Sequence, residues 1–141
     1  MKILIKVTRE ILEKSANCRS SKELGLNCAI SLAVREIFPN AFTTREFILP
    51  NYPKSLYEAL FNTYRYTHLY IDDVYPFAKI SLPEKAIEFI EEFDLNDIEY
   101  RKNMNPISFE VDVPHEVIHS IGISDIYKIL SESKTLELVN I

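Results

Sequence analysis

Two histidines and a glutamate in the last third of the chain have the types and spacing that zinc-dependent hydrolysis requires. His115, Glu116 and His119 form the pattern His-Glu-x-x-His. Residues four apart on a helix share one face, so both imidazoles can bind one zinc ion. Glu116 would then act as the general base on a metal-bound water molecule. A third ligand must come from elsewhere in the chain, where the candidates are His68, Glu132 and Glu137.

This pattern resembles that of the zincin metallopeptidases, and the resemblance implies zinc as a cofactor. Its surroundings favour another interpretation. Pro114 directly precedes the first histidine and Gly122 follows one turn after the second, so the helix is short and His115 lies in its opening turn. A zinc ligand needs a rigid support, which an opening turn does not provide. The alternative is a short surface helix without metal, with both histidines exposed and three inward residues, Val117, Ile118 and Ile121.

Cys28 is the second residue that could carry chemistry. It lies at the start of an expected helix, where the helix dipole would lower the pKa of the thiol and favour the thiolate. A cysteine at a helix start, followed by a strand with a histidine, resembles the arrangement in papain-like hydrolases. His68 would be the base, and Asp72 or Asp112 would orient it. The alternative is a buried thiol, because cysteine outside disulfides is among the most buried residue types.

An aromatic-rich stretch, residues 51–76, is the third candidate. Tyr57, Phe61 and Tyr64 lie at helical spacing in it. Tyrosine and phenylalanine with few charges nearby are typical of protein interfaces, and they are equally at home in a core. The sequence leaves both interpretations open.

Composition and charge argue against several classes of function. The chain has 141 residues and a net charge of −5, whereas nucleic-acid binding depends on Lys and Arg that neutralise phosphates. It contains no apolar run near the roughly 20 residues that cross a bilayer. Charges interrupt the apolar start of the chain, unlike a signal peptide, so we expect a cytoplasmic protein. With only Gly25 and Gly122 available, no glycine-rich phosphate loop can form.

The elements that must position these residues follow from hydrophobic periodicity. Residues 27–38 are predicted to form the central helix, with Asn27 as its N-cap, Ser31 on its polar side and Pro39 after its end. Strands are expected at 2–7, 41–49, 77–82, 107–113 and 136–139. Further helices are expected at 9–17, 84–93, 114–122 and 125–133, with a polar connection at 95–105. Glu91, Glu92 and Asp94 continue a solvated helix face.

These elements predict an α+β fold in a single domain, residues 1–141. A small, mainly antiparallel sheet would pack around the central helix at 27–38. The aromatic helical insert would occupy residues 51–76, and the C-terminal helices residues 114–141.

Three stretches share an outline with other proteins. They are Asn27-Cys28-x-Ile30-x-Leu32-Ala33, Leu82-Pro83 with Phe89-Ile90-x-x-Phe93-Asp94, and Pro106-x-Ser108-Phe109-Glu110-Val111-x-Val113-Pro114. Over residues 1–114, apart from the insert, the chain resembles a set of small uncharacterised proteins of phages and bacteria. Ala29 stands where that set carries proline. The resemblance implies a soluble accessory protein, in the cytoplasm of a bacterial host if it is phage-encoded, and it brings no activity or cofactor.

The sequence therefore predicts a non-catalytic accessory protein without a cofactor. Its expected partner is another protein or a second copy of the chain, with neither nucleic acid nor membrane involved. The aromatic insert and the acidic surface are the predicted contact regions. A zinc-dependent hydrolase and a Cys28 hydrolase are the alternatives.

Overall fold

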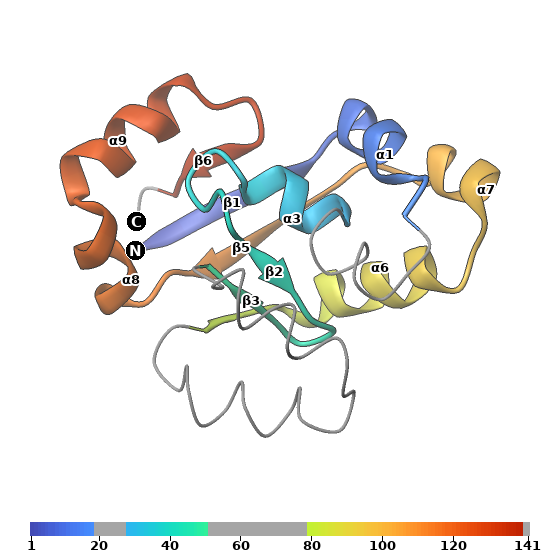
Figure 1. Cartoon of the computed structure of the whole chain (residues 1–141), viewed down its shortest axis with the longest axis horizontal. Helices are drawn as coiled ribbons and strands as arrows, with labels where there is room; N and C mark the ends of the chain where they lie inside the picture. The colour runs from blue at the N-terminus through green and yellow to red at the C-terminus, as the bar shows by residue number, and fades with distance from the viewer. Residues whose placement is uncertain (19–27, 51–78, 140–141) are drawn as a thin grey trace.

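The computed structural model describes residues 1–18, 28–50 and 79–139. In these ranges it contains α-helices and two three-stranded sheets, and every strand pair is antiparallel. The α+β class and the antiparallel pairing are confirmed, but the strands form two sheets rather than one (Figure 1). The predicted insert at 51–76 lies outside the described residues.

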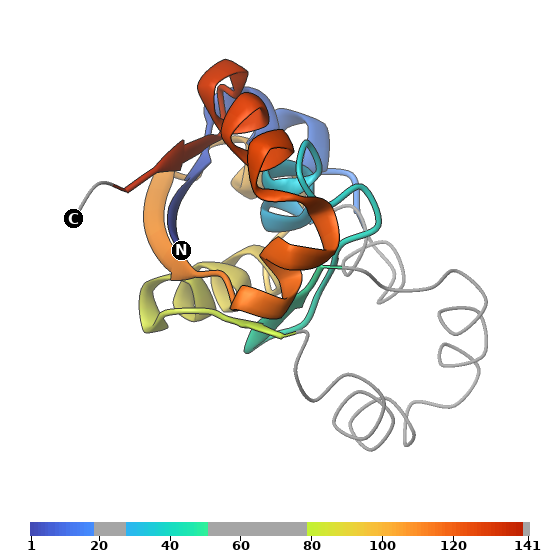
Figure 2. The same ribbon diagram turned by 90° about the vertical axis from the view of Figure 1, so that its left-hand side faces the viewer.

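The larger sheet has the strand order β5-β1-β6. β1 (Lys2–Val7) pairs along its whole length with β5 (Ile107–Asp112), and its other edge pairs with β6 (Leu136–Leu138). Alternate residues of β1 and β5 are buried, as period-two apolar patterning predicts. The helices lie on one side of this sheet (Figure 2). The buried set faces them, and the opposite face carries exposed polar residues such as Lys2, Glu110 and Glu137.

The central helix is shorter than predicted. α3 spans Ala29–Val34, and Cys28 rather than Asn27 is its N-cap. The chain continues in turns to residue 37, so Ile37 is buried without being helical. Ser31 was expected on the polar side but is fully buried. Ser31 can be buried because the Thr43 hydroxyl of β2 gives its hydroxyl a polar partner at 2.6 Å inside the core.

The predicted strand at 41–49 is two strands joined by a tight turn. β2 (Phe42–Thr43) and β3 (Phe47–Leu49) pair with each other, and β3 also pairs with β4 (Ile80–Ser81). The Thr44 hydroxyl accepts hydrogen bonds from the amides of Glu46 and Phe47, at 3.3 and 3.2 Å. Threonine hydroxyls stabilise turns in this way, and this local bond breaks the strand.

Most of the remaining helices match their expected ranges. α1 spans Arg9–Ser15, and its predicted cap is confirmed because the Thr8 hydroxyl accepts from the Ile11 amide at 3.2 Å. α6 spans Glu84–Asp94, α8 His115–Ile121 and α9 Ile123–Glu132. The predicted polar connection at 95–105 instead contains a short helix, α7 (Ile98–Lys102), capped by Asp97. The C-terminal part ends in β6 and is not helical throughout.

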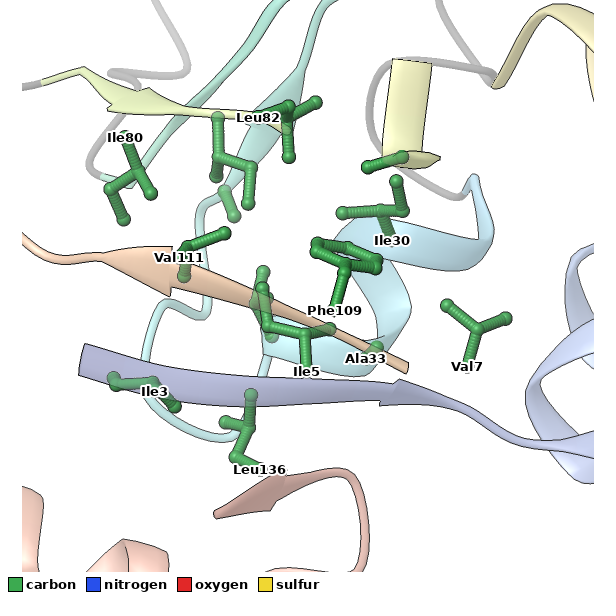
Figure 3. Close-up of a cluster of buried hydrophobic side chains, with 14 of the residues drawn as sticks. Ile3, Ile5, Val7, Ile30, Ala33, Ile80, Leu82, Phe109, Val111 and Leu136 are labelled. Carbon is green, nitrogen blue, oxygen red and sulfur yellow. The ribbon is translucent and has the colours of Figure 1, made fainter. Parts of the chain in front are cut away.

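The core fills the space between α3 and the inner face of the larger sheet. Figure 3 shows Ile5 and Phe109 from the sheet pointing toward Ile30 and Ala33 of α3, with Ile80 of β4 on the same side. Burying one such isoleucine or phenylalanine contributes about 1.5–3 kcal/mol, so this contact outweighs the weak propensity of a six-residue helix. Among the described residues, no helix has both the length and the apolar character needed to cross a bilayer.

Candidate functional site

The two predicted zinc ligands lie side by side on the exposed face of α8. The ring centroids of His115 and His119 are 6.2 Å apart and the ring planes differ by 27°. Val117 and Ile118, on the other face, are buried in the core and hold the helix against the molecule. The expected division of this helix into an exposed histidine face and an inward apolar face is confirmed.

The other proposed members of a hydrolytic zinc centre do not join this pair. Glu116 is exposed in the first turn of α8. Of the candidate third ligands, Glu137 forms an ion pair with Lys6 at 2.7 Å on the outer side of the sheet, and His68 lies outside the described residues. Within the described ranges, no three His, Cys, Asp or Glu side chains gather in a way that could hold a metal ion.

Cys28 belongs to a buried polar cluster at the start of α3. Its Sγ accepts a hydrogen bond from the Ser31 amide at 3.4 Å, and its thiol donates to the Ser31 hydroxyl at 3.5 Å. The Ser31 hydroxyl lies 2.6 Å from the Thr43 hydroxyl of β2. The cluster therefore connects the first turn of α3 to the second sheet.

Burial raises the pKa of the Cys28 thiol, and the hydrogen bonds from Ser31 and Thr43 oppose that shift only in part. The expectation of a lowered thiol pKa is therefore wrong, because burial disfavours the charged thiolate more than these hydrogen bonds favour it. Asp112, one of its proposed helpers, points to the outer face of the sheet and bonds the N-terminal ammonium at 3.3 Å. His68 and Asp72 lie outside the described residues.

The most acidic part of the chain is the segment that contains α6 and the start of α7. Residues 84–99 include seven carboxylates and one lysine, so this segment alone has a formal charge of −6, against −5 for the whole chain. We call residues 91–101, which run from the last turn of α6 into α7, the α6–α7 corner. The predicted solvated face is confirmed for Glu91 and Glu92, which are exposed, but it is wrong for Asp94, which is partly buried.

Two large apolar side chains are exposed on this corner. Leu95 is 82% exposed and Tyr100 is 45% exposed. The same corner has a shallow hollow of about 330 Å³, which is lined by Asn96, Asp97, Ile98, Glu99 and Arg101. The corner thus presents exposed apolar groups beside exposed carboxylates. The sequence predicted the acidic surface as a contact region but did not indicate the exposed apolar side chains.

Local hydrogen bonds fix the shape of the α6–α7 corner. The Asp97 carboxylate caps α7 by accepting from the Tyr100 amide at 2.9 Å. The Tyr100 hydroxyl donates to the Glu92 carboxylate at 2.5 Å, and this bond raises the pKa of the tyrosine. The Asn96 side chain donates to the Glu92 carbonyl at 2.6 Å. The exposed ring is therefore held in place before any partner arrives.

Beneath the surface, Arg101 anchors the corner to the rest of the protein. Its side chain is buried and donates to three main-chain carbonyls, those of Phe93, Ala16 and Cys18. The Asp97 cap was a readable signal for α7, because Asp followed by Glu99 and two basic residues is typical of a short helix. No sequence pattern indicates that Arg101 is buried, because two of its three acceptors, the carbonyls of Ala16 and Cys18, come from a distant part of the chain.

The third group of predicted site residues, Tyr57, Phe61 and Tyr64, lies outside the described residues. Comparisons with protein-family models, with curated proteins and with solved structures find no match to this chain.

Proposed function

We propose that this protein binds another protein and that the α6–α7 corner is its contact surface. The observation that carries the proposal is the exposure of Leu95 and Tyr100 on the α6–α7 corner, next to the most acidic part of the chain. Interface centres are enriched in tyrosine and other large side chains, while their rims are polar. An accessory role of this kind also agrees with the resemblance of residues 1–114 to small accessory proteins.

The charge of the corner defines the kind of partner. The corner carries exposed carboxylates at Glu91, Glu92, Asp97 and Glu99, close in sequence to the two apolar side chains. A complementary surface would present Lys or Arg residues around an apolar side chain that contacts Leu95. Such rim charges act mainly on the association rate and on specificity, so the complex should weaken as ionic strength rises.

Preorganisation favours this corner over the other exposed apolar pair, Ile123 and Tyr127 on α9. That pair is 55% and 47% exposed, but Asp125 and Lys128 next to it give no dominant charge. On the corner, the bonds from Tyr100 to Glu92 and from its amide to Asp97 already restrict the ring. Binding then costs less side-chain entropy, by about 0.5–1.5 kcal/mol for each side chain that is already fixed.

The two apolar pairs provide a matched experiment. Two double variants are compared in the capture of partners from the cells that make the protein. The corner variant combines Leu95→Ala with Tyr100→Ala, and the α9 variant combines Ile123→Ala with Tyr127→Ala. Truncating two interface anchors should lower the affinity by about 10–100-fold, and the α9 variant should bind as the natural chain does. Thermal unfolding of both variants shows whether they remain folded. Equal binding by the natural chain and the corner variant would contradict the proposal.

The aromatic insert is a second proposed contact region, based on the sequence alone. Tyr57, Phe61 and Tyr64 supply the aromatic side chains that interfaces favour. Tyr57→Ser with Phe61→Ser should weaken partner binding or self-association while the protein remains folded. Unchanged assembly and binding would remove the insert from the contact surface and leave the corner as the remaining candidate.

A further inference from the structure

The histidine face of α8 has a geometry that suits a metal ion independently of the protein-binding corner. His115 and His119 project from the same side of the helix, with ring centroids 6.2 Å apart. Neither ring bonds to another described residue, so both have a nitrogen available. Behind them, Val117 and Ile118 are 6% exposed and fix the helix to the core.

The separation of the rings is close to that of a chelating pair. Two imidazoles that each bind one cation through a nitrogen at about 2.0–2.1 Å, at a tetrahedral angle, have centroids about 5 Å apart. The observed pair is wider by about 1 Å, and small rotations about the side-chain torsions of two exposed residues close that difference. The helix supplies the spacing, and the exposed rings can make the adjustment.

We propose that His115 and His119 form a two-imidazole site for a divalent transition-metal ion such as Zn²⁺, Ni²⁺ or Cu²⁺. Imidazole nitrogen suits these ions, whereas Mg²⁺ and Ca²⁺ prefer oxygen ligands. Water or another exchangeable ligand occupies the remaining coordination positions. Glu116 is one residue along, about 100° around the helix, so its carboxylate adds negative charge nearby without completing the coordination on the same face.

The test is a titration of the untagged, full-length chain with NiCl₂ and ZnCl₂. Calorimetry measures the affinity and the number of ions bound, and NMR monitors the imidazole proton signals. The natural chain should bind one ion per chain and shift the signals of both histidines. His119→Ala should lose affinity by about tenfold or more, because only one ligand of the pair remains. MgCl₂ at the same concentration should leave the imidazole signals unchanged.

A control with the same number of histidines separates chelation from simple histidine content. His119→Ala combined with Glu116→His keeps two imidazoles, but at positions 115 and 116, where neighbouring residues do not face each other. This variant should bind as weakly as His119→Ala alone, and circular dichroism should show the same helix content as the natural chain. Equal affinity of the natural chain and either variant would overturn the proposed site.

Discussion

Arg101 and Phe93 are joined by two contacts at the point where α6 and α7 meet. The Nε of Arg101 donates to the Phe93 carbonyl at 2.7 Å, and the guanidinium lies 4.4 Å from the centroid of the Phe93 ring. The same guanidinium donates to the carbonyl of Ala16 at 3.1 Å and to that of Cys18. One buried cation therefore connects the ends of α1 and α6 to α7, and thus supports the surface that presents Tyr100.

Replacing Arg101 should destabilise the protein strongly. Arg101→Leu leaves three buried carbonyl acceptors without their donor, so we expect a loss of about 2–5 kcal/mol in the free energy of unfolding. Urea denaturation measures the difference. Lys102→Leu, at the exposed neighbouring residue, is the control and should change stability by no more than about 0.5 kcal/mol. Similar losses for the two variants would show that Arg101 is not the anchor of this corner.

Asp94 should make stability depend on pH in a defined direction. Burial raises the pKa of Asp94 above its ordinary value of 3.8, and the charges of Arg101 and Arg45 offset this only partly. The folded protein then holds the proton more tightly than the unfolded chain. Its stability therefore falls as the pH rises from about 3.8 through the raised pKa, and the loss persists at neutral pH.

The substitution Asp94→Asn removes this penalty. We expect a higher melting temperature than that of the natural chain at pH 7, and a smaller difference at acidic pH, where both side chains are uncharged. Glu91→Gln, at an exposed position of the same helix, should show no such pH-dependent gain. A lower melting temperature for Asp94→Asn at pH 7 would mean that the attraction to Arg101 outweighs burial.

The thiol of Cys28 should be unreactive in the folded protein. It is 7% exposed, and burial raises its pKa, so little thiolate reaches solvent at neutral pH. Iodoacetamide at pH 7, followed by mass spectrometry of the peptide that contains Cys28, should show modification only after denaturant is added. Rapid labelling of the folded chain at pH 6 would instead support an activated thiol and the cysteine hydrolase.

Gly122 should be required for the turn between α8 and α9. Its φ is +100°, in a region that residues with a side chain rarely adopt. A Cβ at this position would meet only the Asp125 carboxylate at 3.6 Å, an ordinary contact, so the cost of Gly122→Ala comes from the backbone. We expect a loss of about 1–3 kcal/mol in chemical denaturation. Ser124→Ala, nearby and exposed, is the control, and an equal effect of the two substitutions would contradict this account.

Local patterns predicted the elements whose stability is local. The alternation of β5 and the Thr8 cap of α1 needed no knowledge of the rest of the chain. The errors arose where distant groups decide the structure. The burial of Ser31 depends on the Thr43 hydroxyl across the core, and the burial of Arg101 depends on carbonyls more than 80 residues away in sequence. For the same reason, the sequence identified the histidine pair of α8, but it could not show whether any candidate third ligand for a metal ion lies near that pair.

The apolar side chain at the centre of the acidic corner, Leu95, allows the most direct test of the protein-binding proposal. A photoreactive amino acid is placed at position 95 in one chain and at position 123 in another, and both are irradiated in lysates of the cells that make the protein. We predict an adduct at position 95 that weakens as salt is added to the lysate before irradiation, with the cross-linked segment of the partner rich in Lys and Arg. Equal cross-linking at both positions, or an adduct at 95 with an acidic segment, would contradict the account.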